Sequence, residues 1–262
     1  MSTQSKPTKR ELREERRAAR LEAERAEAAA AARRTRTWRL LAALGLAVVI
    51  VAIAAAVSSS GGGEQEAAPP AASQEAARLF AGIPEKDGVL GQADAPVILT
   101  EFVDLQCPVC AQASQETLPA IIDKYVRTGE VKLDARTLHF IGPDSERAAL
   151  VAAGAAEQGR LWPFLEAFYA AQGEENSGYV TDEFLRGVAS AAGVDADEAL
   201  AYAATPAARE RLNRANRDAQ ALGVNATPTF TAAKGDGAQR VIAGGNHDVA
   251  SVSRALDQEL KG

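Results

Sequence analysis

The chain has 262 residues, of which 47% are hydrophobic and 24% are charged, so it can hold one sizeable folded domain with additional segments. Its net charge of −6 is unevenly distributed, because residues 1–39 carry a net charge of +6 and residues 40–262 carry −12. There are two cysteines, and His139 and His247 are the only histidines. The irregular spacing of these two histidines argues against a structural zinc site built with the cysteines. No metal or nucleic-acid partner is expected.

The basic segment 1–39 is followed by an apolar run over residues 40–57 without charged or strongly polar side chains. As a helix, this run would cover about 27 Å, close to the roughly 30 Å hydrocarbon core of a bilayer. We predict a single-pass transmembrane helix, a signal anchor in the cytoplasmic membrane. Arginines directly before it place the N-terminus inside and the rest of the chain outside.

A cleaved signal peptide is the alternative to this anchor, with small residues at 54–56 as a cleavage site. Both the basic segment and the apolar run are long for a signal peptide. Neither cysteine lies close behind the apolar run, which excludes attachment through a lipidated N-terminal cysteine. Both alternatives place the remaining domain on the same side of the membrane.

Residues 58–80 begin as a polar, low-complexity stretch and are predicted to be a flexible linker. The exported domain is assigned to residues 81–262. Its first predicted strand, over 96–103, is followed by the sequence Cys107-Pro108-Val109-Cys110. This placement puts the only two cysteines at a junction between a strand and a helix and predicts disulfide exchange.

A helix that begins here would carry Pro108 at its first position, where the missing N–H costs nothing. The free N–H groups and the helix dipole would then favour the thiolate form of Cys107, which makes this residue the expected nucleophile. Cys110, one turn further on, suits the role of resolving thiol. The alternatives are a structural disulfide, which would stabilise little across so short a loop, and half of a zinc site.

Further elements follow in chain order. A helix over 111–128 should end at Gly129, and a strand over 131–141 should run parallel to the first strand. Helices are predicted over 146–158, 161–172, 182–192, 196–203 and 206–223, and aromatic residues in the second of these are assigned to the core. Pro228 precedes a strand that forms a hairpin with a strand over 239–242, and a helix over 248–260 closes the domain.

Three motifs are similar to the DsbA-like branch of the thioredoxin superfamily, over residues from about 86 to 262. They are the run from Glu101 to Cys110, the Gly142-Pro143 pair at the start of the helical stretch, and Thr227-Pro228-Thr229-Phe230. The resemblance implies an α/β thioredoxin fold with an inserted helical domain over about 143–205. It also implies a redox-active disulfide between Cys107 and Cys110, with no other cofactor.

The resemblance further implies that the dithiol faces a cis-proline loop at Pro228. Thr227, the residue before this proline, would present backbone groups to a bound client chain, which pairs with it like an added strand. With Pro108 and Val109 beside the cysteines, these residues make up the predicted substrate-binding set.

Glu101 matches the position of a buried acid that exchanges a proton with the resolving cysteine in thioredoxin-like proteins. Burial would raise the pKa of this carboxyl group and suit it to that task, and a solvated position at the strand end is the alternative. Asp104 is expected to be a loop residue. Val109 stands where the strongest oxidants of the family carry histidine, and its lack of an N–H donor should make this protein a milder oxidant.

The expected function is that of an exported, membrane-tethered oxidase of cysteine pairs in translocated proteins. The resemblance suggests a quinone-linked membrane partner that would reoxidise it, and an exported compartment without a reducing glutathione pool favours oxidation. A reductase or isomerase of the same fold stays open because of Val109. A chaperone that binds unfolded chains beside Pro228, with an incidental dithiol, is a further alternative.

Overall fold

The computed structural model of the protein describes residues 78–245 and 248–261. The predicted cytoplasmic segment 1–39, the membrane helix 40–57 and the linker up to residue 77 lie outside these residues, as does His247. No helix within 78–245 and 248–261 is both long and apolar enough to cross a bilayer.

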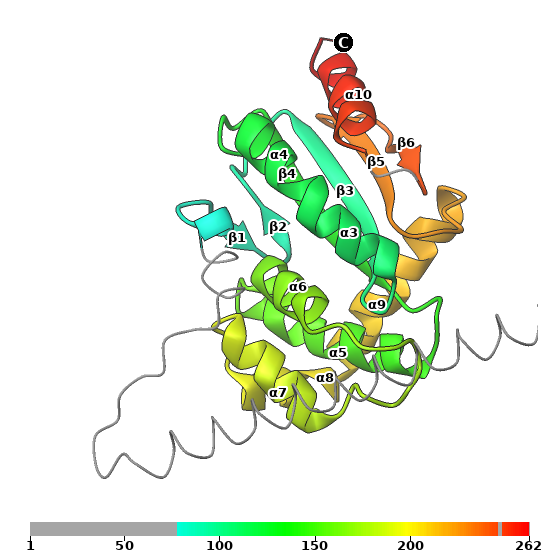
Figure 1. Cartoon of the computed structure of the whole chain (residues 1–262). Coiled ribbons are helices and arrows are strands. Elements are labelled where there is room, and N and C mark those ends of the chain that lie inside the picture. Colours follow the sequence, from blue (N-terminus) through cyan, green and yellow to red (C-terminus); the bar gives the residue numbers. More distant parts are fainter. Residues whose placement is uncertain (1–77, 246–247, 262) are drawn as a thin grey trace, which may run out of the picture. The chain divides into compact units, whose positions relative to one another are not determined.

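The described strands form a six-stranded sheet in the order β1-β2-β4-β3-β5-β6 (Figure 1). They are β1 (Glu85–Lys86), β2 (Val89–Leu90), β3 (Val97–Asp104), β4 (Val131–Leu138), β5 (Thr229–Lys234) and β6 (Arg240–Gly244). β3 and β4 are parallel, as predicted, and the other neighbouring pairs are antiparallel. The predicted hairpin of the last two strands is confirmed.

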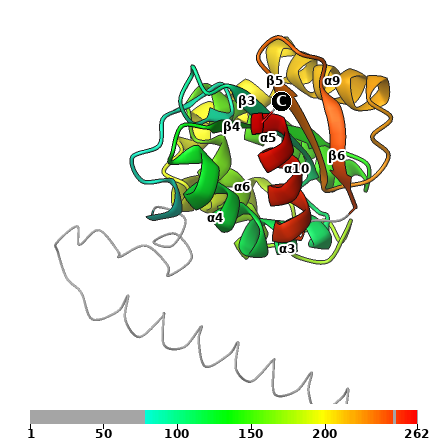
Figure 2. The same ribbon diagram turned by 90° about the horizontal axis from the view of Figure 1, so that it is seen from above.

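Helices cover both faces of this sheet. Figure 2 shows α3 (Pro108–Glu116), α4 (Leu118–Ile121) and α10 (Val249–Lys261) on one side of the strands and α9 (Pro206–Ala221) on the other. Under α9, Phe102 of β3 packs in a small apolar cluster with Leu138, Ala215, Ala219 and Val224. Seven of the eight residues of β3 are buried, because this central strand lies between the two helical layers.

The predicted single helix over 111–128 is wrong as a continuous element. It consists of α3, α4 and a π-helical turn, η1 (Ile122–Val126). Pro119 has no N–H to bond to the carbonyl one turn earlier, so the α-helical ladder cannot continue unbroken there. The predicted stop is confirmed, since Gly129 has a φ of 77°, a conformation that glycine adopts without steric cost.

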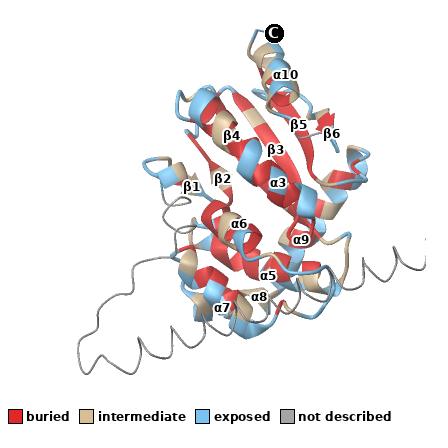
Figure 3. Cartoon of the chain, viewed as in Figure 1, coloured by how far each residue is buried: buried red, intermediate tan, exposed pale blue. Residues whose placement is uncertain are grey.

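Four helices separate β4 from α9. They are α5 (Pro143–Glu157), α6 (Leu161–Ala170), α7 (Asp182–Ala191) and α8 (Ala196–Ala203), and Figure 3 shows buried residues along the inner sides of α5 and α6. The aromatic residues of α6 lie in the core, as predicted: Trp162, Phe164 and Phe168 are each at most 1% exposed. The four helices α5 to α8 therefore form a packed insertion between β4 and α9 of the sheet domain.

The β1–β2 hairpin was not predicted. Asp87 and Gly88 form its turn with φ values of 53° and 80°, and an Asp-Gly pair is a strong sequence signal for such a turn. The strands on either side have two residues each, too few for an alternating pattern. Trp162 fixes the hairpin to α6, because its indole N–H donates to the carbonyl of Gly88 at 3.0 Å.

Candidate active site

Cys107 lies at the N-terminus of α3, and Pro108 occupies the first turn, as the sequence predicted. The backbone N–H groups of Cys110 and Ala111 donate to the carbonyl of Cys107 at 3.1 and 3.2 Å, which closes the first turn around the motif. The N–H groups of Val109 and Cys110 also stabilise the thiolate of Cys107 and lower its pKa. The helix start thus surrounds this sulfur with donors.

The pKa of Cys107 is lowered to about 6. The largest cause is the thiol of Cys110, which donates a hydrogen bond to the Cys107 sulfur; burial opposes this effect, and the side chain of Thr227 adds to it. At neutral pH, Cys107 is therefore mainly a thiolate, the reactive form in disulfide exchange.

The pKa of Cys110 is shifted in the opposite direction. Burial is the largest of the causes that raise its pKa well above the usual range, and the sulfur of Cys107 and the carboxylate of Glu101 act in the same direction. Cys110 is fully buried, whereas Cys107 is 7% exposed. An approaching protein therefore meets the sulfur of Cys107 before that of Cys110.

The predicted client-binding residues surround Cys107. Pro108 and Val109 are exposed, Val109 by 38%, and the sulfur of Cys107 lies 3.4 Å from the carbonyl oxygen of Thr227. The Thr227–Pro228 peptide bond is cis, as the family resemblance implied. The structure thus brings Pro108, Val109 and the half-buried Thr227 around Cys107, with Pro228 buried directly behind Thr227; their roles in binding a client stay predictions.

Glu101 is 6% exposed and lies in the middle of β3, so it is not a solvated residue at the strand end. Burial, and to a smaller extent the charge of Glu166, raise its pKa to about 8. The carboxyl group is therefore mostly protonated at neutral pH. The charge of Glu101 contributes to the raised pKa of Cys110, and the exchange of a proton between the two groups stays a prediction.

Asp104 was expected in a loop, and this expectation is wrong. It is the last residue of β3 and is fully buried. Its carboxylate accepts hydrogen bonds from the N–H of Gln106 at 3.0 Å, the hydroxyl of Ser145 at 2.6 Å and the N–H of Ile141 at 3.0 Å. The turn that leads to Cys107 is therefore fixed to the start of the helical insertion.

Two residues of α6 near the cysteines were also missed as site residues. The carboxylate of Glu166 accepts a hydrogen bond from Ser114 of α3 and contributes to the raised pKa of Glu101. The hydroxyl of Tyr169 is buried without a hydrogen-bond partner among the described residues. Its pKa is raised well above the usual range by burial first and then by the charge of Cys110. Nothing local in the sequence connects this helix to the cysteines.

This geometry agrees with the comparisons to known proteins. The family model described as thioredoxin matches residues 84–258. The chain is 30% identical over 181 residues to a probable disulfide bond formation protein D of Bacillus anthracis, and the match covers 66% of this chain and 77% of that protein. The chain belongs to the thioredoxin family, in its DsbA-like branch.

Solved structures agree with this assignment. Oxidised BdbD from Bacillus subtilis is 26% identical and superposes with a TM-score of 0.59 over 69% of this chain and 97% of that chain. Wolbachia pipientis alpha-DsbA1, at 18% identity, has a TM-score of 0.57 over 66% of this chain and 90% of that chain and supports the fold alone. This DsbA-like protein is thus a thiol-disulfide oxidoreductase.

Proposed function

We propose that this oxidoreductase oxidises cysteine pairs in exported proteins on the outer side of the cytoplasmic membrane. The observation that carries the proposal is the difference between the two cysteines. Cys107 is 7% exposed and has a pKa of about 6, whereas Cys110 is fully buried and has a strongly raised pKa. Such a pair directs incoming thiols to one sulfur and keeps the other for the internal bond.

In the first step, a client thiolate attacks the sulfur of Cys107 in the oxidised protein. The bond between Cys107 and Cys110 breaks, a mixed disulfide forms, and Cys110 leaves with the electron pair. Its high pKa makes Cys110 a poor leaving thiolate, so a proton donor assists this step. Glu101, which is protonated at neutral pH and buried near Cys110, can supply this proton.

In the second step, the client's other thiolate attacks the client sulfur of the mixed disulfide. Cys107 leaves as a stabilised thiolate, and a leaving thiol of low pKa leaves faster. The client has then lost two electrons and gained a disulfide, while the cysteine pair has gained two electrons. Stabilisation of the Cys107 thiolate favours the reduced protein, which is the property of an oxidant.

The reduction potential of the Cys107–Cys110 pair tests the direction of this reaction. Equilibration of the full-length protein with glutathione buffers, followed by separation of the two redox forms, should give a value well above the roughly −270 mV of thioredoxin. A value near thioredoxin's would contradict the oxidase and favour the reductase, the alternative that Val109 supports through its lack of an N–H donor.

A chaperone function is separated from oxidation by a different measurement. Cys107→Ser should abolish disulfide formation in a reduced test protein with one native disulfide. If this variant keeps all of the client-directed activity, measured as prevention of aggregation, and the wild-type protein forms no disulfides, the chain is a binding module. Loss of disulfide formation alone is the result that the oxidase requires.

The membrane tether rests on the sequence of residues 40–57, and the recycling partner rests on family resemblance. We propose that a membrane protein reoxidises the cysteine pair and passes the two electrons to quinone. Membrane fractionation with protease digestion of intact spheroplasts tests the topology. The account requires a membrane-bound domain that external protease reaches, and a domain that is protected inside the cell would contradict it.

A further inference from the structure

A polar cavity lies on the α9 side of the sheet, lined by residues of β2, β4 and α9 and by none of the predicted active-site residues. Its volume is about 130 Å³, which is below the roughly 300–1,000 Å³ of sites for drug-sized ligands and suits a small ion or a headgroup. Its charged lining residues are Asp87, Asp134, Arg136, Arg211 and Arg214. Three positive side chains thus meet two negative ones.

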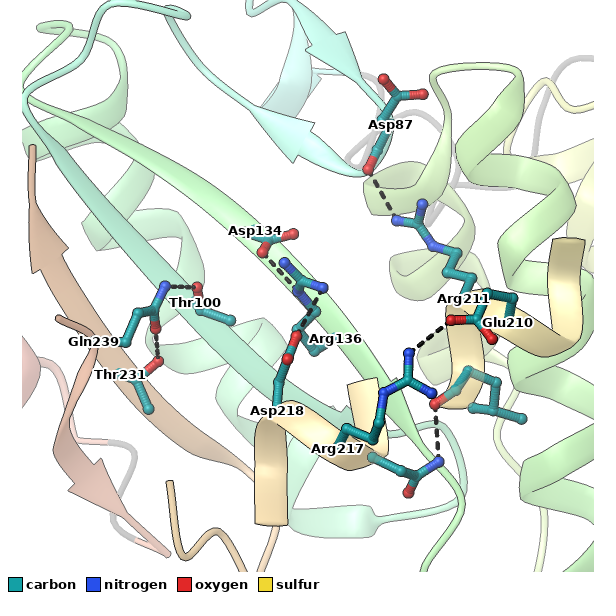
Figure 4. Close-up of polar contacts among 12 residues, drawn as sticks. Asp87, Thr100, Asp134, Arg136, Glu210, Arg211, Arg217, Asp218, Thr231 and Gln239 are labelled. Carbon is teal, nitrogen blue, oxygen red and sulfur yellow. Dashed lines mark hydrogen bonds and ion pairs between the residues drawn. The ribbon is translucent and has the colours of Figure 1, made fainter. Parts of the chain in front are cut away.

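The charge of Arg136 is already balanced. Its guanidinium donates to Asp134 at 2.7 Å and to Asp218 of α9 at 3.2 Å, and Figure 4 shows it between these two carboxylates. Asp134 is nearly completely buried, with a side chain that is 5% exposed. Asp134 forms its ion pair with Arg136 and interacts with Arg211 only through charge at a longer distance.

Arg211 has no such carboxylate partner. Its half-buried side chain donates to the backbone carbonyl of Asp87 at 2.9 Å, and the carboxylate of Asp87 points away from it in Figure 4. Within residues 78–245 and 248–261, no carboxylate oxygen lies within 4.0 Å of the guanidinium of Arg211 or of Arg214. Burial lowers the pKa of Arg211, and the charge of Asp134 opposes this effect from beyond hydrogen-bond distance.

Contacts within the protein also hold the guanidinium of Arg211 in place before any ligand binds. A Cβ atom added at Gly88, which has a φ of 80°, would lie 2.4 Å from a terminal nitrogen of the Arg211 guanidinium. The close approach of the Gly88 backbone and the bond to Asp87 hold the guanidinium at the cavity. A guanidinium that is ordered before binding loses less entropy when it forms bonds to an anion.

From these contacts we infer that the cavity is a binding site for a phosphate-type oxyanion, held by Arg211 and Arg214. Two guanidinium groups without carboxylate partners match the double charge and the several acceptor oxygens of such a group, to which arginine donates in a forked geometry. The phosphate can be a free ion or the headgroup of an anionic lipid, since the chemistry at the arginines is shared. This site does not depend on the proposed oxidase function.

The test uses the full-length chain in neutral detergent at constant ionic strength, with two probes in separate titrations. One probe is inorganic phosphate, and the other is a short-chain phosphatidylglycerol below its micelle concentration. Calorimetric binding and an upward shift of the unfolding temperature are expected with at least one probe. Tighter binding of the first identifies the free ion, and tighter binding of the second identifies a lipid headgroup.

Arg211→Gln with Arg214→Gln should weaken binding at least tenfold. Arg217→Gln is the matched control, because Arg217 lies on the same helix but is paired with Glu210 at 2.6 Å, and it should leave binding unchanged. Arg214→Gln alone removes an exposed side chain and serves if the double variant does not fold; it should weaken binding several-fold. Absence of binding by the wild-type protein at millimolar probe, or equal affinities in all variants, would overturn the site.

Discussion

The sulfur of Cys107 lies 3.4 Å from the carbonyl oxygen of Thr227, a residue 120 positions later in the chain. This contact joins the start of α3 to the loop that precedes β5, so one sulfur faces both the helix N-terminus and the proposed client-binding backbone. The fold therefore activates the nucleophile at the place where a client chain would bind. The predictions below change one part of this arrangement at a time.

The first prediction concerns the ionisation of the two thiols. Alkylation of the reduced protein should follow a single titration with a pKa of about 6 that belongs to Cys107, while Cys110 stays unreactive. The rate of iodoacetamide modification against pH, with the modified residue located by mass spectrometry, measures this. Cys107→Ser should abolish the titration. Modification of Cys110 first would contradict the assignment.

The stability of the reduced protein should depend on pH through Cys107. The folded state lowers the pKa of this thiol from 9.0 to about 6, so the unfolded chain binds more protons between these values. Stability from this group is present above pH 9 and is lost as the pH falls through 6. The difference in unfolding free energy between reduced and oxidised forms should rise by about 3 kcal/mol from pH 6 to pH 9, because the thiol is half titrated in one of the two states at each of these pH values. Denaturant unfolding of both forms measures this difference, and a flat profile would refute the linkage.

Glu101→Gln should slow disulfide transfer while it stabilises the fold. The folded state raises the pKa of this carboxyl group from 4.5 to about 8, so its stabilising contribution is present below pH 4.5 and is lost as the pH rises through 8. Replacement by a neutral side chain should increase the unfolding free energy by about 3 kcal/mol at pH 7. Unfolding curves measure the stability, and stopped-flow oxidation of a dithiol measures the rate.

A merely structural role of Glu101 would give a different pattern. The rate of the Gln variant should lose the part of its pH dependence centred near pH 8, because the titrating donor is gone. Glu130→Gln, a change on the exposed surface, is the control and should leave both the rate profile and the stability unchanged. An unaltered rate profile in Glu101→Gln would show that Glu101 moves no proton.

Thr227→Val should raise the pKa of Cys107 by about one unit, because a hydrogen bond to a charged group contributes about 1.5 kcal/mol or more. The side chain of Thr227 is one of the groups that lower this pKa. Thiolate absorbance in the ultraviolet measures the change, and Thr227→Ser should retain the wild-type value. Equal pKa values in all three proteins would show that the hydroxyl has no part in the activation.

Val109→His should make the protein a stronger oxidant. The side chain of Val109 is exposed beside Cys107, and a protonated imidazole there adds positive charge near the thiolate and lowers its pKa. The reduction potential should rise by at least about 30 mV, which corresponds to a tenfold change in the equilibrium with glutathione. Val109→Leu controls for side-chain size. An unchanged or lower reduction potential in the His variant would contradict the prediction that Val109 makes this protein a milder oxidant.

Features of the site that depend on residues close together in the sequence could be predicted. Pro108 and the apolar strand before it locate the helix start. Alternation along residues 131–141 predicts a strand that the intervening helix makes parallel, and the structure ends this strand at Leu138. The break near Pro119 was also a local signal, but helical spacing on both sides of it concealed the interruption.

Contacts between distant segments could not be predicted in this way. The role of Asp104 depends on Ser145, which is 41 residues away in the chain. The influence of Glu166 on Glu101 depends on how α6 packs against α3. Arg211 gave no sequence signal at all, since its hydrogen bond to the carbonyl of Asp87 joins residues that are 124 positions apart.

Trapping with a Cys110→Ser variant is the measurement that tests the central claim most directly. Without Cys110 to resolve it, a mixed disulfide at Cys107 cannot be released internally. The variant expressed in cells should accumulate mixed disulfides with exported proteins, joined through Cys107 and absent when Cys107 is also replaced by Ser. If no such adducts form, or if they are joined to cytoplasmic proteins alone, Cys107 does not exchange disulfides with exported clients.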